Sequence, residues 1–187
     1  MNMITIIKII LLPVICALIL FFIKFNFYTY PIPLGVFLGI TYVISYKKNR
    51  FLNLFLNVLF SFIVYFTGYL ILLLLGMFLN QLSNLGTVLA FVIAGFFVSP
   101  ILLFFAYNFL FTFPKTKFSF MVKTISVLFL AIYSFVIFKD GNTEYIKIAD
   151  KNSFLNPYLL WQPVMLLAIQ LILHQKELKA LFKTKNR

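Results

Sequence analysis

Six long apolar runs, separated by short polar or basic turns, constrain this chain more than any other feature. A helix needs about 20 apolar residues, within a range of about 17–25, to cross the hydrocarbon core of a bilayer. The runs, extended where their flanks allow, cover residues 4–23, 27–46, 51–79, 87–111, 118–138 and 157–173. Because 63% of the residues are hydrophobic and only 11% are charged, a soluble domain of 187 residues could not bury them. We therefore predict an all-α fold: a polytopic integral membrane protein in which residues 1–187 form a single domain, a compact bundle of six transmembrane helices.

The second and third runs differ in length. The second has an apolar core of 32–46 only, so it reaches a spanning length if residues 27–30 join its helix. A re-entrant segment around 32–46 stays open as an alternative. The third run, 51–79, is longer than the hydrocarbon requires and is expected to tilt or project. In the fourth run, Ser99–Pro100 is expected to kink the helix, because proline removes a backbone hydrogen bond.

The distribution of positive charge predicts the orientation. The chain carries sixteen Lys and Arg residues against four acids, a net charge of +12. With six spans and a cytoplasmic N-terminus, twelve of the sixteen cations face the cytoplasm, including those of the turn 47–50 and of the basic tail 174–187. The short external loop 139–156 then holds three of the four acids. The positive-inside rule therefore favours an N-in/C-in topology.

The same charge indicates which partners the chain meets. Basic clusters at the cytoplasmic face are expected to contact membrane lipids through their anionic headgroups. Nucleic acid is not expected as a partner, because the chain has no basic soluble module to bind it.

The side chains available for chemistry are few. Cys16 is the only cysteine and His174 the only histidine, so the sequence predicts no metal site and no cofactor. The predicted spans contain no Asp or Glu, which argues against a carboxylate-based proton relay at membrane depth. An enzyme acting on lipid would have to rely on Lys123 and the serines near it. We expect Lys123 to be a membrane-edge anchor instead, and the protein not to be an enzyme.

Two polar stripes run along otherwise apolar helices, one in the third run and one in the sixth. Their members are Asn53, Asn57, Ser61, Gln162, Gln170 and His174. Amide side chains in hydrocarbon need partners, so both stripes are expected to face protein or water. Two interpretations stay open. The stripes line a polar pocket or conduction path between the third and sixth spans, or they make hydrogen bonds between helices worth about 0.6 kcal/mol each.

Small residues recur at helical spacing in the second and fourth runs. They are Gly35, Gly39, Gly86, Ala90, Ala94, Gly95 and Ser99. Such patterns let two helix backbones approach closely. They indicate either packing within this protein or a docking face for a second copy or another membrane protein.

Three classes of function remain. The first is a non-enzymatic accessory protein or subunit of a membrane complex, including inhibitor and immunity-type roles. The second is a small-solute transport component, because six spans in 187 residues with this orientation resemble the substrate-binding subunits of energy-coupling-factor transporters. The third is a lipid-modifying membrane enzyme. We expect the first, in the bacterial cytoplasmic (inner) membrane, with an organellar membrane as the alternative location.

Overall fold

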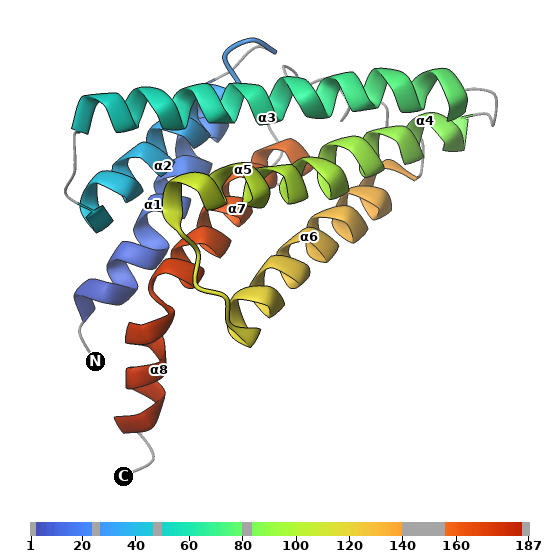
Figure 1. Cartoon of the computed structure of the whole chain (residues 1–187). Helices are drawn as coiled ribbons and strands as arrows, with labels where there is room; N and C mark the ends of the chain where they lie inside the picture. The colour runs from blue at the N-terminus through green and yellow to red at the C-terminus, as the bar shows by residue number, and fades with distance from the viewer. Residues whose placement is uncertain (1–2, 24–26, 47–49, 80–83, 140–155, 185–187) are drawn as a thin grey trace.

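The computed structural model describes most of the chain, in five ranges: 3–23, 27–46, 50–79, 84–139 and 156–184. Every regular element within these ranges is a helix (Figure 1), so the all-α prediction is confirmed. Three helical segments are long and apolar enough to cross a membrane: Phe51–Leu79, Leu85–Phe111 and Lys117–Phe138. The predicted external loop 139–156 lies almost wholly outside the described residues.

The helices follow the apolar runs of the sequence. In chain order they are α1 (Met3–Phe22), α2 (Pro31–Tyr46), α3 (Arg50–Leu79), α4 (Asn84–Phe91), the π-helical segment η2 (Val92–Val98), α5 (Ser99–Phe111), α6 (Lys117–Phe138), α7 (Pro157–Leu173) and α8 (Gln175–Thr184). The fourth run is thus one continuous helical segment made of α4, η2 and α5.

Residues 27–30 do not join the second helix, so this helix begins later than predicted. They form a turn in which the Ile32 N–H donates to the Thr29 carbonyl (3.1 Å), and α2 begins at Pro31. The ring of Pro31 disfavours helical geometry at Tyr30, whereas proline itself fits the first turn of a helix. α2 is therefore 16 residues long, or about 24 Å at 1.5 Å per residue.

The expected irregularity in the fourth run takes the form of a π-helix. In η2 the helix is wider, and the N–H of Ser99 donates to the carbonyl oxygen of Ala94, five residues earlier. The Ser99 hydroxyl donates to the same oxygen (2.7 Å). Pro100 follows directly, in the first turn of α5. A π-helical register just before a proline is one way a helix accommodates the ring and the missing N–H.

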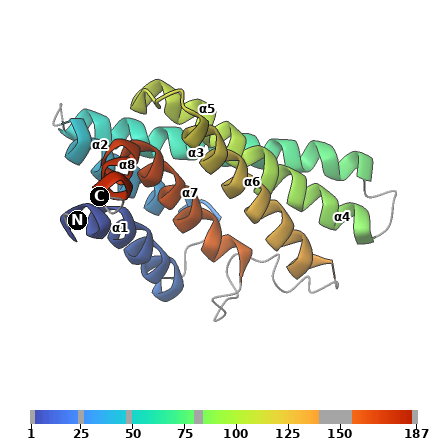
Figure 2. The same cartoon turned by 90° about the horizontal axis from the view of Figure 1, so that it is seen from below.

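Two groups of helices make up the bundle (Figures 1 and 2). α3 runs antiparallel to α4–η2–α5, and α6 packs on η2. The shorter α1, α2 and α7 form the other group, in which α1 packs on α7. The two groups meet where α2 packs extensively on α3 and where α7 packs on α6. The first residues of α1, α3 and α6 and the last residues of α2, α5 and α7 lie at one end of the bundle, on the left in Figure 1.

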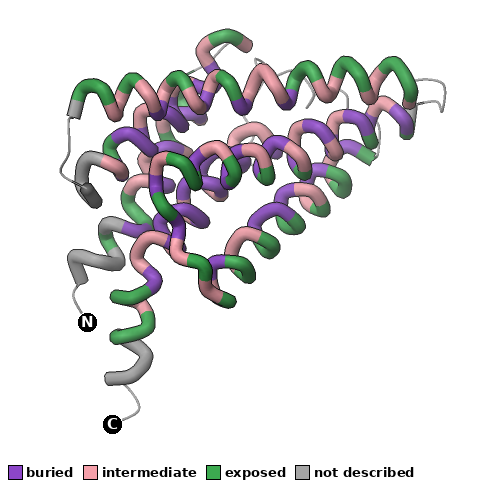
Figure 3. Tube along the Cα trace, viewed as in Figure 1, coloured by how far each residue is buried: buried purple, intermediate pink, exposed green. Residues whose placement is uncertain are grey.

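Buried residues gather where helices face one another, and exposed residues lie on the outward faces (Figure 3). Many of the exposed residues are large and apolar. Half of the most apolar 18-residue stretch of α4–η2–α5 is buried inside the bundle, whereas the corresponding stretches of α3 and α6 are 17% and 22% buried. The outward face of α3 exposes residues such as Leu70, Leu74 and Phe78. A continuous apolar exterior of this kind suits hydrocarbon rather than water.

The basic tail contains a helix that the sequence analysis missed. A single residue separates α8 from the end of α7, and the direction of α8 differs from that of α7 (Figure 1). His174 stands between them, with its Nδ1 3.2 Å from Glu177 Oε1. The signal was present in the sequence, because Leu178 and Leu181 are three residues apart among lysines, a spacing typical of an amphipathic helix.

Candidate functional site

The polar stripe on α7 makes its hydrogen bonds to α2 and to the residue before it. Gln162 Nε2 donates to the carbonyl oxygen of Tyr30 (2.6 Å). About two turns further along α7, Gln170 Nε2 donates to Thr41 Oγ1 (2.7 Å). The Thr41 hydroxyl in turn donates to the carbonyl of Phe37 on α2 (2.9 Å). Both glutamines are buried. The α7 stripe therefore holds α7 against the start of α2 and against its second half.

The polar stripe on α3 bonds to different neighbours. Ser61 Oγ donates to the carbonyl oxygen of Pro31, at the start of α2 (2.9 Å). Asn57 Nδ2 donates to the carbonyl of Asn53 within α3 (2.7 Å). The Asn57 carbonyl accepts from the Tyr107 hydroxyl on α5 (2.7 Å). The α3 stripe therefore connects α3 to α2 and to α5.

The two stripes are separated by α2, which packs on both α3 and α7. None of the hydrogen bonds described for Asn57 or Ser61 reaches Gln162 or Gln170. His174 lies beyond the stripe contacts, at the end of α7 beside Glu177.

Some buried polar atoms of these stripes have no hydrogen-bond partner. Among the described residues, the Oδ1 of Asn57 and the Oε1 of Gln162 are in this position, as is the indole Nε1 of Trp161. Each amide uses its nitrogen and leaves its oxygen unpaired. A buried acceptor without a donor is costly, by about 1–3 kcal/mol, so these are points at which water or a small polar solute would gain hydrogen bonds.

The glycines of α2 pack within the protein. A Cβ at Gly35 would lie 2.5 Å from the Cα of Val58, and one at Gly39 would lie 2.6 Å from Leu54 Cδ1 and 3.1 Å from its Cα. Both neighbours belong to α3, so α2 and α3 approach closely at this Gly-x-x-x-Gly pattern.

The small residues of the fourth run are not equivalent. Gly86, Ala90, Ala94 and Ser99 are buried, whereas a Cβ at Gly95 would meet nothing within 4 Å. Gly95 therefore lies off the packed face.

A glycine of α3 that the sequence analysis did not single out completes the contact with the fourth run. A Cβ at Gly68 would overlap the Ser99 side chain and would lie 3.8 Å from the carbonyl oxygen of Ala94. Gly68 thus faces the π-helical segment at the residues where its register changes. The sequence signal was weak, because Gly68 has no small partner four residues away on either side.

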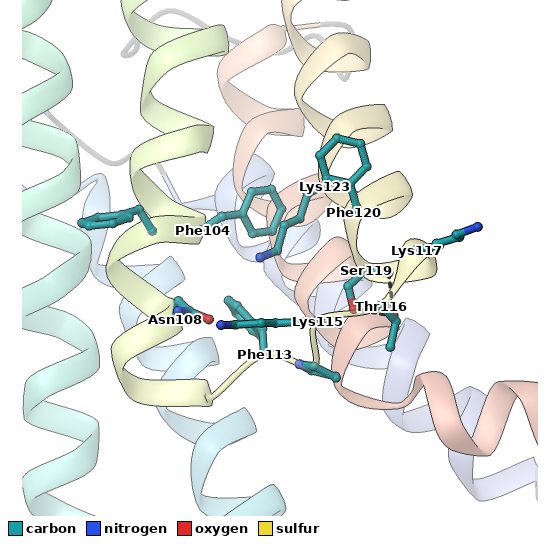
Figure 4. A pocket seen from close by; sticks show the side chains of 11 residues that line it. Phe104, Asn108, Phe113, Lys115, Thr116, Lys117, Ser119, Phe120 and Lys123 are labelled. Carbon is teal, nitrogen blue, oxygen red and sulfur yellow. Dashed lines mark hydrogen bonds between the residues drawn. The ribbon is translucent and has the colours of Figure 1, made fainter.

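An open cleft of about 770 Å³ lies between the end of α5 and the start of α6 (Figure 4). Three lysines are among its lining residues: Lys115, Lys117 and Lys123, the last of which was expected only as a membrane-edge anchor. The Lys123 ammonium lies 5.6 Å from the ring centroid of Phe104 and 4.9 Å from that of Phe113. The cleft could not be found from sequence, because its walls come from two helices and the turn between them.

The rim of this cleft is ordered by hydrogen bonds. Thr116 caps α6, since its Oγ1 accepts from the backbone N–H of Ser119 (3.1 Å). The Thr116 hydroxyl donates to Oε1 of Gln175, the first residue of α8 (2.6 Å). Thr112 ends α5 in a left-handed conformation, with a φ of 35°. The turn that leads into α6 is thereby held against the junction of α7 and α8.

The serines near Lys123 are engaged elsewhere. Ser126 Oγ donates to the backbone oxygen of Lys123 (2.9 Å), and Ser119 Oγ lies 3.2 Å from Thr116 Oγ1. Neither of these contacts involves the Lys123 ammonium, which rests on aromatic rings. Neither Ser119 nor Ser126 is therefore described in contact with the Lys123 ammonium. The residues that the structure describes also contain no cluster of His, Cys, Asp and Glu that could hold a metal ion.

Comparisons with protein-family models, with curated proteins and with solved structures find no match to this chain.

Proposed function

We propose that this chain is a six-span membrane protein of the bacterial cytoplasmic membrane, with both ends in the cytoplasm. The arrangement of helix ends supports this topology. The ends of α2, α3, α5, α6 and α7 that adjoin basic segments gather, together with the start of α1, at one end of the bundle (Figure 1). In this topology the shorter α1, α2 and α7 cross beside the three long helical segments, and α2 is short because a proline pair starts it.

Within that membrane we propose a non-enzymatic role, as an accessory subunit of a larger complex, with inhibitor or immunity-type roles included. The observation that carries this proposal is the use of the polar side chains. Gln162, Gln170 and Ser61 join helices to one another rather than presenting themselves to a reactant. The outward surfaces of α3 and α6 are mainly apolar. Such a surface suits contact with lipid or with the helices of a partner.

Cysteine labelling in cells tests the topology. In a Cys16→Ala background, single cysteines are placed at Tyr28, Lys139 and Lys176, all of which are exposed. Six spans require that positions 28 and 139 react with an impermeant reagent from outside, and that position 176 reacts only after permeabilisation. If only the three long segments crossed, with position 139 still outside, positions 28 and 176 would exchange their behaviour. That exchange would refute the proposal, and position 139 serves as the internal control.

The accessory role is tested by purification of the tagged chain from its native membrane in mild detergent. We expect a stoichiometric membrane-protein partner, with the complex migrating above the 21.8 kDa of this chain. A monodisperse, partner-free monomer would contradict an accessory role.

A small-solute transport component remains a second proposal, because one specific observation favours it. The unpaired oxygens of Asn57 and Gln162 are buried acceptors that a solute with N–H or O–H groups would satisfy. In that case Gln162→Leu should abolish solute binding to the purified protein. If the amides serve helix contacts alone, small molecules extracted with the protein should be the same for the variant and the wild type.

A further inference from the structure

The cleft between α5 and α6 carries positive charge that no acid among its lining residues balances. Lys115, Lys117 and Lys123 line it. The chain has no Asp or Glu before residue 140, so no carboxylate on α5, on α6 or between them offsets these ammonium groups. Charges interact more strongly at the edge of a low-dielectric region than in water. The cleft therefore attracts an anion.

Two of the three lysines extend into the cleft. Figure 4 shows the side chains of Lys115 and Lys123 reaching toward α5, where Asn108 lies, whereas Lys117 points away. The rings of Phe104 and Phe113 attract the Lys123 ammonium. Aromatic faces leave most of the donor capacity of an ammonium group unused, so its N–H groups remain for an anionic oxygen.

The walls beside these polar groups are apolar and exposed. Phe105 of α5 has 67% of its surface exposed, and Phe120 of α6 has 73%. Both residues are among those that line the cleft. A free phosphate ion makes no apolar contacts and would leave these walls exposed, whereas the acyl chain of a lipid would cover them. The combination of a cationic interior and apolar walls matches an amphipathic ligand.

We propose that this cleft binds an anionic phospholipid. Lys115 and Lys123 contact the headgroup phosphate, the Asn108 amide donates to it, and acyl chains lie along Phe105 and Phe120. The volume of about 770 Å³ is in the range of small-molecule sites. The assignment rests on the proposed topology, which puts the cleft at the cytoplasmic headgroup level, where basic pockets between helices meet anionic lipid.

Binding is tested with the purified full chain in neutral detergent micelles. The melting temperature is followed during titration with phosphatidylglycerol, phosphatidylcholine or inorganic phosphate. We expect a saturable rise with phosphatidylglycerol alone. Lys115→Gln and Lys123→Gln should each weaken the apparent affinity about fivefold, equivalent to about 1 kcal/mol per lysine. Lys117→Gln is the matched control, with the same loss of charge on a side chain that points away, and should change the affinity by less than about twofold.

The outcomes separate the possible occupants. Equal stabilisation by phosphatidylcholine would overturn the role of the lysines. Equal stabilisation by inorganic phosphate would mean an ion site without lipid. An effect of Lys117→Gln as large as that of Lys115→Gln would mean unspecific attraction by net charge. Melting of each variant without lipid reports folding, and the exposed Lys115 keeps the test valid if Lys123→Gln unfolds.

This test and the topology test can fail independently. Binding in micelles has no sidedness, so it is unaffected by whether six or three helices cross. Labelling at positions 28 and 176 in cells is read without added lipid.

Discussion

Gly35→Ala tests how closely α2 and α3 are packed. A Cβ at position 35 would lie 2.5 Å from Val58 Cα, 2.6 Å from Ser61 Oγ and 3.1 Å from the Asn57 carbonyl oxygen. Favourable carbon contacts lie at about 3.5–4.0 Å, so the two helices have to separate locally by about 1 Å. Val58 Cα and the Asn57 oxygen are backbone atoms and cannot rotate away. The separation therefore has to spread along the helix pair.

The magnitude follows from two opposing effects. Overpacking of a tight interface costs about 1–3 kcal/mol, while alanine in place of glycine in a helix returns about 1 kcal/mol. Gly76→Ala is the matched control, because a Cβ there meets nothing within 4 Å. Gly76→Ala therefore gains the stability that alanine gives a helix over glycine, without a steric clash. The free energy of unfolding of Gly35→Ala should therefore lie about 1–3 kcal/mol below that of Gly76→Ala.

The assay is thermal unfolding of both variants and the wild type in the same detergent. For a chain of this size, 1 kcal/mol corresponds to about 2–4 °C in melting temperature. We expect Gly35→Ala to melt below Gly76→Ala by about 2–12 °C, a range that combines the overpacking cost with this conversion. If Gly35→Ala melts at or above Gly76→Ala, the close approach of α2 and α3 is refuted.

Three further substitutions have distinct expected outcomes. Gln170→Leu should shift the melting temperature by less than about 3 °C, because a lost contact of about 0.6 kcal/mol leaves Thr41 with its own backbone partner. Tyr107→Phe removes the buried bond to the Asn57 carbonyl and should cost about 1 kcal/mol in chemical unfolding. Gln175→Ala releases the start of α8 from the N-cap threonine of α6, so limited proteolysis should cut the tail faster than in wild type; an unchanged cleavage rate would show that this bond does not hold α8.

All helices except α8 were predictable, because they lie in runs of apolar residues ended by polar or proline residues. The start of α7 illustrates this: Asn156 caps it through a bond from the Tyr158 N–H (3.0 Å), and Pro157 needs no N–H partner in the first turn. The start of α2 was predicted too early, because apolar character alone does not register the constraint that Pro31 puts on the residue before it.

The partners of the polar side chains were not predictable. The sequence shows that Gln162 and Gln170 need hydrogen-bond partners, but it does not say which helix provides them. Pairing with α3 was one expectation, and the partners are Tyr30 and Thr41, because α2 packs between α3 and α7. Which helices become neighbours is a global property of the packed bundle, decided by close contacts such as that at Gly35.

Local chemistry in the sequence accounts for the helical composition, the apolar exterior and most helix ends, because propensity, capping and hydropathy act over a few residues. Tertiary structure alone decided the position of α2, the role of Gly68, the contact of α8 with Thr116 and the cleft around Lys123. Each of these joins segments distant in sequence. Their contact depends on side-chain shape and on the angle between helices, which the order of residues along one run does not contain.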